Sequence, residues 1–330
     1  MLTVLADPMQ FAAARPGETP WLSVVMPIHG GQSWLSATLE SVAAQNCTGI
    51  EFILFDSSSN SDCRTIAEGY MDRLAIRYEA RPDITPWTAK TNLAVIESKA
   101  PWIAMLHQDD LWLEGRVEAI RAAIAAHGEA AMIVAPSHFV GPDGRKVGTW
   151  SLPFRRGLRP GAEIGRMLLV QEVIALPAPV IRRDAWLAVG GIDEALWYTG
   201  DWDLYLKLSA TGPVAVLPRS TTAFRLHASS LTMTGSRDLA DFRAQMADVL
   251  ARHRRVFADH ADRALLSCAE ASIEVNCALA RAAAGDRSAW RDLGAVLLRL
   301  GPLRLWTYLQ LSRVLDRAMP RLRLKLAGAL

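Results

Sequence analysis

The chain has 330 residues, 51% of them apolar and 21% charged, which excludes an intrinsically disordered protein. Its 36 basic and 34 acidic side chains leave a formal net charge of +2, too small to favour nucleic acid as a partner. The four cysteines form no C-x-x-C pair and no metal-ligand spacing, so we expect reduced thiols and a reducing, cytoplasmic compartment.

The N-terminal segment predicts a loose leader. Residues 1–20 include Pro16, Gly17 and Pro20 and lack the basic and apolar regions of a signal peptide. No run of about twenty apolar residues occurs in the chain, so no membrane-spanning helix is expected. The protein is therefore expected to be soluble or to lie on a membrane face.

From residue 22 onward, apolar β-branched segments alternate with segments of helical periodicity. The alternation predicts strands at 22–28, 51–56, 76–78 and 102–106, and helices within 33–45, 65–74 and 88–98. Such alternation is typical of βαβ units, so the sequence predicts an α/β domain with a mainly parallel sheet flanked by helices.

The alternation ends after residue 110. The turn Pro142-Asp143-Gly144 predicts a β-hairpin, and Asp184 is expected to cap a short helix that stops at Gly190-Gly191. Late strands are expected at 214–218 and 222–226, and the remainder has an Ala-, Leu- and Arg-rich helical pattern. These patterns divide the chain into a leader, an α/β domain and a helical region, with the boundaries 1–20, 21–234 and 235–330.

Acidic residues follow two of the predicted parallel strands. Asp56 ends one strand, and Asp109-Asp110 come after another. Ligands of open α/β sheets bind beyond the carboxyl ends of the strands, so these carboxylates can face one crevice. A carboxylate pair suits Mg²⁺ or Mn²⁺ in a site completed by substrate phosphates. The alternative is that Asp109 caps a helix over 111–120 and Asp110 lies in its first turn.

Three later clusters also carry charge. Asp201 and Asp203 come before an amphipathic helix, where capping is again the alternative. Arg225 and His227 lie two apart on an extended segment and hence on one face, an arrangement that suits a phosphate. The pair Arg182-Arg183 is expected to be solvated.

In chain order, these segments resemble family 2 glycosyltransferases over about residues 23–232. The similar segments are SVVMPIHGGQSWLSATLESVAAQ, EFILFDSSSNSD, AKTNLAV, WIAMLHQDDLW, VIRRDAWLAVGGIDEAL, GDWDLYLKL and FRLHASSLT. Each is weak alone, but their order makes chance convergence improbable.

The resemblance implies a glycosyltransferase A-type fold and inverting sugar transfer from a nucleoside-diphosphate donor, with a UDP-sugar expected. The acceptor would be a hydroxyl of a glycan or of a lipid-linked saccharide, as in polysaccharide biosynthesis at the cell envelope. Asp201 would be the general base, and Asp109 would bind Mn²⁺ or Mg²⁺, with His227 at the metal or the diphosphate. The residues expected at the nucleotide and donor are Pro27, His29, Asp56, Ser58, Lys90, Asn92, Asp110 and Arg225.

The chain departs from the family pattern at several places. Ser57, His107 and Gly200 stand where the family often has acids, and His29-Gly30 where it often has Tyr-Asn. A noncatalytic nucleotide- or carbohydrate-binding paralogue is therefore one alternative. A nucleotidyltransferase is another, although the turn PIHGGQSW lacks the basic residue of a phosphate loop.

The last 34 residues alternate Leu, Trp and Tyr with arginine and lysine and contain few acids. A basic amphipathic helix of this kind can lie on the inner face of an anionic membrane. The alternative is a helical cap packed on the catalytic domain or on a second subunit, with arginine stems covering apolar surface.

Overall fold

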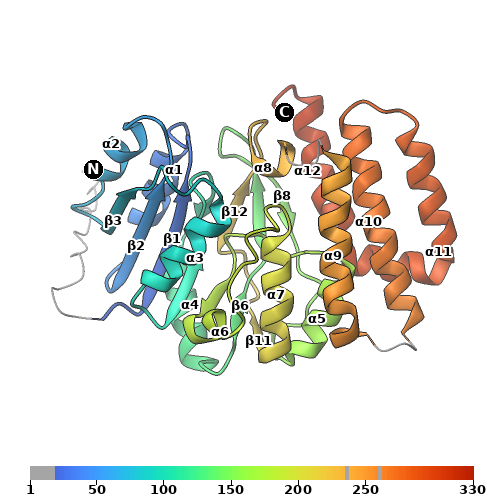
Figure 1. Cartoon of the computed structure of the whole chain (residues 1–330), viewed down its shortest axis with the longest axis horizontal. Helices are drawn as coiled ribbons and strands as arrows, with labels where there is room; N and C mark the ends of the chain where they lie inside the picture. The colour runs from blue at the N-terminus through green and yellow to red at the C-terminus, as the bar shows by residue number, and fades with distance from the viewer. Residues whose placement is uncertain (1–18, 235–237, 259–261) are drawn as a thin grey trace, which may run out of the picture.

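The computed structural model describes residues 19–234, 238–258 and 262–330 (Figure 1). Most of the expected leader, residues 1–18, lies outside the described residues. The strands are β1 (Leu22–Ile28), β2 (Ile50–Asp56), β3 (Ala75–Ala80), β4 (Trp102–Met105), β5 (Leu111–Trp112), β6 (Met132–Val134), β7 (Ser137–Val140), β8 (Lys146–Trp150), β9 (Gly157–Arg159), β10 (Val180–Arg182), β11 (Val214–Val216) and β12 (Thr222–Arg225). The helices are α1 (Leu35–Ala43), α2 (Asp62–Glu68), α3 (Trp87–Glu97), α4 (Arg116–Ala126), α5 (Gly161–Val170), α6 (Arg183–Ala188), α7 (Gly200–Thr211), α8 (Leu231–Thr234), α9 (Leu239–Phe257), α10 (Arg263–Ala283), α11 (Ala289–Ser312) and α12 (Val314–Leu326).

The main sheet has the order β3-β2-β1-β4-β10-β6-β11-β9, and its first four strands are parallel. All seven residues of β1 are buried, which explains why all of them except Ser23 are apolar. Alternate side chains point to opposite faces: Val25 packs with one core that includes α3, and Val24 with a second that includes α1. The predicted mixed, mainly parallel sheet flanked by helices is confirmed.

A smaller sheet of order β5-β12-β7-β8 lies beside the first, and β7 and β8 form the predicted hairpin. The helix expected over 111–120 begins only at Arg116. Leu111 and Trp112 instead pair with Ala223 and Thr222 of β12, and Gly115 turns the chain in a left-handed conformation before α4. Asp109 therefore does not cap this helix.

Three other expectations are corrected by the structure. The predicted helix 65–74 is α2, and the chain turns after Glu68. Asp184 and Asp201 lie inside the first turns of α6 and α7, so neither is an N-cap. Arg183 is not solvated as expected: it donates to the carbonyl of Ile96 at 2.8 Å and to Ser98 Oγ at 3.1 Å.

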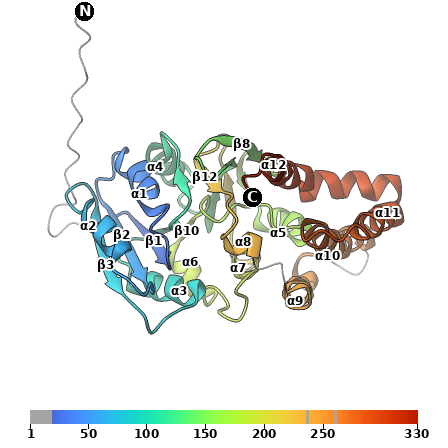
Figure 2. The same ribbon diagram turned by 90° about the horizontal axis from the view of Figure 1, so that it is seen from above.

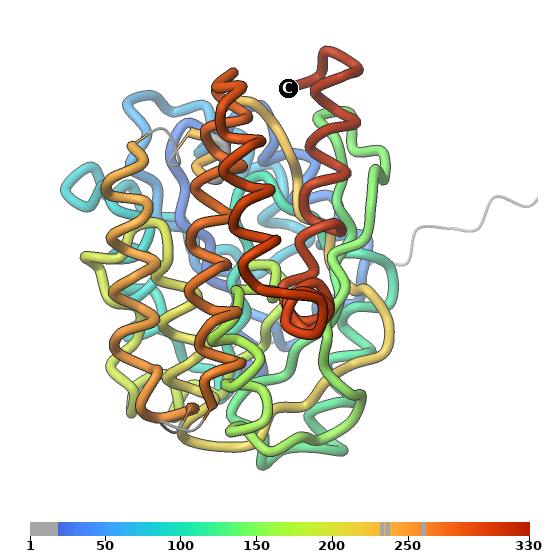
Figure 3. Tube along the Cα trace, turned by 90° about the vertical axis from the view of Figure 1, so that its right-hand side faces the viewer, coloured from blue at the N-terminus to red at the C-terminus, as the bar shows by residue number. Residues whose placement is uncertain are grey.

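The helical region packs as a layer on the α/β domain (Figures 2 and 3). Leu265 of α10 shares one core with Leu168 of α5, and Leu324 of α12 packs with Phe139 of β7. α11 bends at Gly301-Pro302, where the backbone is not helical. The cap expected as one alternative is thus present, whereas the boundary at residue 234 stays a prediction. None of the helices in the described ranges has the length and apolar character needed to cross a bilayer.

Candidate active site

The ends of β1 and β2 form the expected nucleoside side of the site. Asp56 is buried at the end of β2, where it accepts a hydrogen bond from the Ser58 amide at 2.6 Å and another from the Tyr78 hydroxyl. In the adjacent turn, Ser58 Oγ accepts from the Gly30 amide at 2.8 Å. Pro27 lies beside Phe55 in the register of the two strands. The two turns are therefore joined before any ligand binds.

Lys90 lies beneath this turn and is almost fully buried. Its ammonium donates to the Ile28 carbonyl at 2.5 Å and to Ser57 Oγ at 2.8 Å. His29 Nδ1 lies 3.1 Å from the same Ser57 hydroxyl. Burial lowers the pKa of Lys90 to about 8, although the charge of Asp56 opposes this shift. Ser57, which replaces an expected acid, thus serves as the shared partner of Lys90 and His29.

Gln108 was missed in the sequence analysis. Its side chain accepts from the His29 amide at 2.8 Å and donates to the His29 carbonyl at 3.0 Å. A Cβ at Gly31 would lie 2.4 Å from this side chain, so a larger residue there would displace Gln108 from these bonds. Gln108 therefore fixes the turn after β1 against the chain leading to Asp109. Its position before two aspartates was the only signal in the sequence.

Asp109 and His227 meet although they are far apart in the chain. His227 Nε2 lies 2.9 Å from Asp109 Oδ2, and its Nδ1 lies 2.9 Å from Ser229 Oγ. The His227 ring also lies against Trp34, with centroids 5.0 Å apart. Burial opposes ionisation of Asp109, but the hydrogen bond with His227 and the charges of His107 and His227 hold its pKa below the usual value.

Asp110 has a different environment. It is 2% exposed, and its carboxylate accepts from the Arg225 amide at 3.0 Å. Burial and the adjacent charge of Asp109 raise its pKa well above the usual value. Asp110 is thus buried against the backbone of β12 and is not open to a ligand.

Arg225 is also occupied by the protein itself. Its guanidinium donates to the carbonyl oxygens of Asp109 at 2.8 Å, Pro142 at 3.2 Å and Gly141 at 3.3 Å, and lies 4.9 Å from the centre of the Trp34 ring. These bonds hold the β7–β8 turn against the Asp109 segment. The expected contact of Arg225 with the diphosphate stays a prediction.

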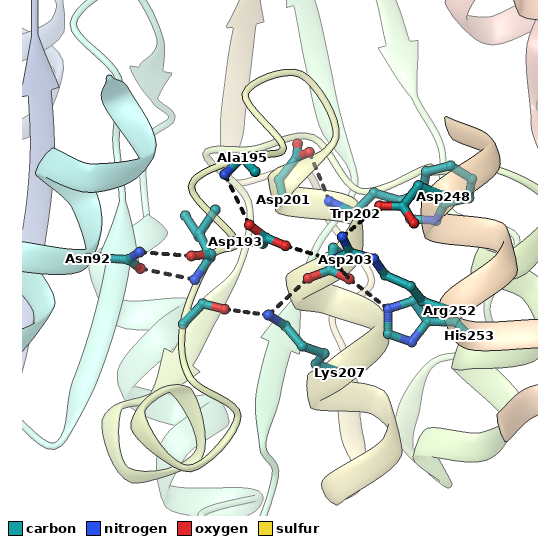
Figure 4. Close-up of polar contacts among 12 residues, drawn as sticks. Asn92, Asp193, Ala195, Asp201, Trp202, Asp203, Lys207, Asp248, Arg252 and His253 are labelled. Atoms are coloured by element: carbon teal, nitrogen blue, oxygen red, sulfur yellow. Dashed lines mark hydrogen bonds and ion pairs between the residues drawn. The ribbon is translucent and has the colours of Figure 1, made fainter. Parts of the chain in front are cut away.

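Asn92 holds the loop before α7. Its amide group exchanges hydrogen bonds with the backbone of Ile192 at 2.8 and 2.9 Å (Figure 4). It also donates to Glu194 at 3.0 Å. A Cβ at Gly191 would lie 2.6 Å from the Asn92 oxygen, which explains the glycine there. Asn92 therefore positions this loop, and its predicted role near the donor is untested.

The two aspartates of α7 have opposite surroundings (Figure 4). Asp203 is buried and bonded to Lys207 at 2.9 Å and His253 at 2.8 Å, so it anchors α9. Asp201 accepts only the Trp202 amide at 2.8 Å, and no basic side chain of the described residues lies within salt-bridge distance. Burial raises the pKa of Asp201 to about 6. Asp201 is thus the carboxylate of the pair that is free to accept a proton.

Two groups near Asp201 were missed in the sequence analysis. Burial and the charge of Asp201 raise the pKa of Glu172 well above the usual value, while Arg317 opposes this shift. The buried Tyr205 hydroxyl has no hydrogen-bond partner among the described residues. No motif marked Glu172, which reaches Asp201 only through the packing of distant segments. Tyr205 lies one helical turn after Asp201 within GDWDLYLKL, and this spacing is the signal that could have found it.

A divalent metal has limited protein ligands here. The described part of the chain contains no group of three or more His, Cys, Asp or Glu side chains that could hold a metal. Asp109 and His227 provide a carboxylate and an imidazole, and substrate phosphates and water commonly complete such a site. His107 lies against Trp87, and its buried Nε2 has no hydrogen-bond partner there; burial lowers its pKa to about 4.

Comparison with known proteins decides the family. Residues 23–182 match the family model described as "Glycosyl transferase family 2". This segment is a family 2 glycosyltransferase domain. An uncharacterized glycosyltransferase of Rickettsia prowazekii is 21% identical over 226 residues, which cover 68% of this chain and 70% of the relative. The chondroitin synthase of Pasteurella multocida is 24% identical over 195 residues, which cover 58% of this glycosyltransferase and 19% of that protein.

Solved structures share the fold. The structure of S. aureus TarS 1–349 in complex with UDP-GlcNAc has a TM-score of 0.57 at 13% identity and covers 83% of this chain and 90% of that one. The mannosyltransferase PcManGT of Pyrobaculum calidifontis, in complex with GDP-Man and Mn²⁺, has a TM-score of 0.52 at 17% identity and covers 89% and 85%. The predicted family, glycosyltransferase A-type fold and transferase activity are confirmed.

Proposed function

We propose that this glycosyltransferase moves a sugar from a UDP-sugar to a hydroxyl of a glycan or lipid-linked acceptor, with inversion and with Asp201 as general base. The observation that carries the proposal is the state of Asp201. Its carboxylate has no ionic partner among the described residues, and burial raises its pKa to about 6. A base with this pKa is ionised at neutral pH and holds a proton better than an ordinary aspartate.

The reaction requires one carboxylate. Asp201 takes the proton of the acceptor hydroxyl as that oxygen attacks the anomeric carbon and the bond to the nucleoside diphosphate breaks. Direct displacement inverts this carbon and needs no covalent intermediate. Burial and the charge of Asp201 raise the pKa of Glu172 well above its usual value, which disfavours a second negative charge beside the base.

The donor would lie along the ends of β1, β2 and β4. We infer that Asp56 contacts the nucleobase and that the preformed turn of His29 and Ser58 borders the nucleoside. The hydrogen bonds that join this turn to Lys90 and Gln108 support the assignment, because they hold it rigid without a ligand. TarS crystallised with UDP-GlcNAc and with UDP, and we extend the uridine donor to this chain as part of the proposal.

The divalent cation, Mn²⁺ or Mg²⁺, would be held by Asp109 and His227. Their 2.9 Å separation and their chemistry fit a metal that receives its other ligands from phosphate and water. When bound, such an ion neutralises charge on the leaving diphosphate. PcManGT, crystallised with GDP-Man and Mn²⁺, is consistent with metal use on this fold.

The Asp201→Asn variant tests the base. It removes the proton acceptor while keeping the side-chain shape, so UDP binding with Mn²⁺ should stay within about twofold of wild type while transfer falls by about 100-fold or more. Isothermal titration and a donor-hydrolysis assay report the two properties. Near-normal turnover by Asp201→Asn would show that another group is the base. Wild-type protein that binds UDP but neither transfers nor hydrolyses a UDP-sugar would instead favour the noncatalytic alternative.

We also propose a cytoplasmic location with contact to the inner membrane face. α12 packs Pro320 and Leu324 inward, whereas Leu315, Leu322 and Leu326 are exposed along its outer side. Basic residues lie among the exposed apolar ones, which suits an anionic lipid surface. Such contact would bring the enzyme to a lipid-linked acceptor.

A further inference from the structure

Arg317 and Arg321 lie one turn apart on α12 and form an unbalanced cationic pair. The other half-buried arginines in the described part of the helical region have carboxylate partners: Arg281 with Asp286 and Asp292, and Arg313 with Asp316. Even the exposed Arg243 and Arg252 are paired, with Glu274 and with Asp193 and Asp248. Arg317 and Arg321 have none within salt-bridge distance among the described residues. Two adjacent cations withdrawn from water without a counter-charge are costly.

Among the residues that the structure describes, Arg321 is held in place by neutral partners only. It donates to the Arg317 carbonyl at 2.6 Å, and its guanidinium lies 5.4 Å from the centre of the Phe139 ring. Burial, together with the charge of Arg317, lowers the pKa of Arg321 to about 10. It therefore stays charged at neutral pH, with a face of Phe139 in place of an anion.

Arg317 is fixed by a chain of polar side chains that reaches the segment before Glu172. It donates to Asn276 Oδ1 at 3.0 Å, and the Asn276 amide donates to Gln171 Oε1 at 2.6 Å. Its second terminal nitrogen, Nη1, is buried and has no hydrogen-bond partner among the described residues. A guanidinium held at one nitrogen with the other unsatisfied is ready for an oxyanion.

The pair acts on the Asp201 side of the active site. The charge of Asp201 raises the pKa values of Glu172 and Tyr198. The charge of Arg317 lowers the pKa of Glu172, and the charges of both arginines lower that of Tyr198. The groups that act on Asp109 and Asp110 are instead His107, His227 and Arg225. Direct contacts give the same placement: Trp202, which follows Asp201, donates to the Leu168 carbonyl at 2.7 Å, and Gln171, three residues after Leu168, is joined through Asn276 to Arg317. The arginine pair therefore lies on the Asp201 side, away from Asp109 and His227.

We propose that Arg317 and Arg321 form an oxyanion-binding subsite for an acceptor that carries a phosphate or carboxylate group near its reacting hydroxyl. The inference rests on the proposed function, because it takes Asp201 to mark the acceptor side. A planar guanidinium with a free nitrogen binds such oxyanions through charge-assisted hydrogen bonds. The helical region would then select the acceptor while the α/β domain binds the donor.

The test uses the full chain, with inorganic phosphate and acetate as probes. UDP and Mn²⁺ are present at saturation, so that the diphosphate site is filled. Calorimetry on wild type should detect binding of at least one oxyanion, and the stronger of the two identifies the acceptor group as phosphate or carboxylate. In the double variant Arg317→Gln/Arg321→Gln, the affinity for this oxyanion should fall by roughly tenfold or more, because one or two charged hydrogen bonds are lost. Arg304→Gln removes an equal charge from an exposed position of α11 and should leave binding unchanged.

Three results would overturn the proposal. The first is that wild type binds neither oxyanion, and the second is that the double variant and Arg304→Gln bind the oxyanion with equal affinity. The third is that the double variant loses UDP affinity in parallel with oxyanion affinity, which would place the arginines at the donor. Arg317→Lys/Arg321→Lys guards against misfolding: it keeps both charges and should retain measurable binding with a wild-type melting curve. The proposed function is tested separately, by the UDP-sugar turnover of wild type and of Asp201→Asn. Oxyanion affinity does not report either of these activities.

Discussion

His227 Nε2 lies 2.9 Å from Asp109 Oδ2, although the two residues are 118 positions apart in the chain. The contact joins the segment between β4 and β5, where the chain passes from the main sheet to the smaller one, to the segment after β12. Neither residue has a second acidic or imidazole neighbour placed to complete a metal site within the described chain. Metal affinity without nucleotide should therefore be weak.

This arrangement predicts that metal and nucleotide bind together. Asp109→Asn should remove most of the Mn²⁺-dependent part of UDP affinity, roughly tenfold or more, because the remaining imidazole is a poor sole ligand. Titration of UDP with and without Mn²⁺ measures this Mn²⁺-dependent part of the affinity. Asp62→Asn, at an exposed position of α2, is the control of equal charge. Equal Mn²⁺ dependence in the two variants would exclude Asp109 as a ligand.

The raised pKa of Asp201 predicts the pH dependence of transfer. The base must be ionised, so kcat at saturating donor should be constant above pH 7 and fall about tenfold per pH unit below about 6. The measurement is a pH profile of kcat between pH 4.5 and 8, a window chosen to span the Asp201 titration. A profile that stays flat down to about pH 5 would contradict the assignment.

Asp203 should matter for stability more than for chemistry. Although burial opposes its charge, hydrogen bonds from His253 and Lys207 hold the pKa of Asp203 below the usual value. Asp203 therefore stabilises the fold fully at pH values above the ordinary aspartate pKa, and this stabilisation is lost as pH falls through the lowered pKa of the folded state. Asp203→Asn should lower the free energy of unfolding by roughly 3 kcal/mol at pH 7. Asp248→Asn, which loses an exposed pair with Arg252, should cost less than about 1 kcal/mol. Urea unfolding of both variants checks the contrast.

Gly165 tests how tightly the helical region is joined to the α/β domain. A Cβ there would lie 2.1 Å from the Phe257 ring of α9, so Gly165→Ala forces the helices apart. We expect a loss of roughly 1–3 kcal/mol, as for other overpacked cores. Because the core is shared, thermal unfolding should remain a single transition at lower temperature. Separate transitions would show that the two parts fold independently.

The outer side of α12 should control membrane contact. Leu322→Glu/Leu326→Glu places two anions on the exposed apolar side, and binding to vesicles rich in phosphatidylglycerol should fall by roughly tenfold or more. Ile96→Glu, exposed on α3, should not change it. Co-sedimentation with anionic and neutral vesicles measures the effect. Equal binding by the variants and wild type would remove α12 as the contact.

The sequence by itself determined the scaffold. Short, mainly apolar runs such as Leu22–Ile28 indicate strands buried on both faces, and their alternation with helices indicates parallel connections. It also singled out Asp56, Asp109 and Asp201, because local order along the chain places them at strand ends and at the start of a helix. These are properties that short segments carry without their neighbours.

Only the tertiary structure gave a physical reason to separate the aspartates of α7, which the family resemblance had distinguished without one. Asp201 and Asp203 look alike in the sequence, yet His253 and Lys207 neutralise one and leave the other free. The same holds for Arg225, bonded to three backbone carbonyls, and for Arg317, left with an unsatisfied nitrogen. The reason is physical: pKa and availability depend on burial and on partners that the fold brings together from distant segments, and no local pattern encodes those distances.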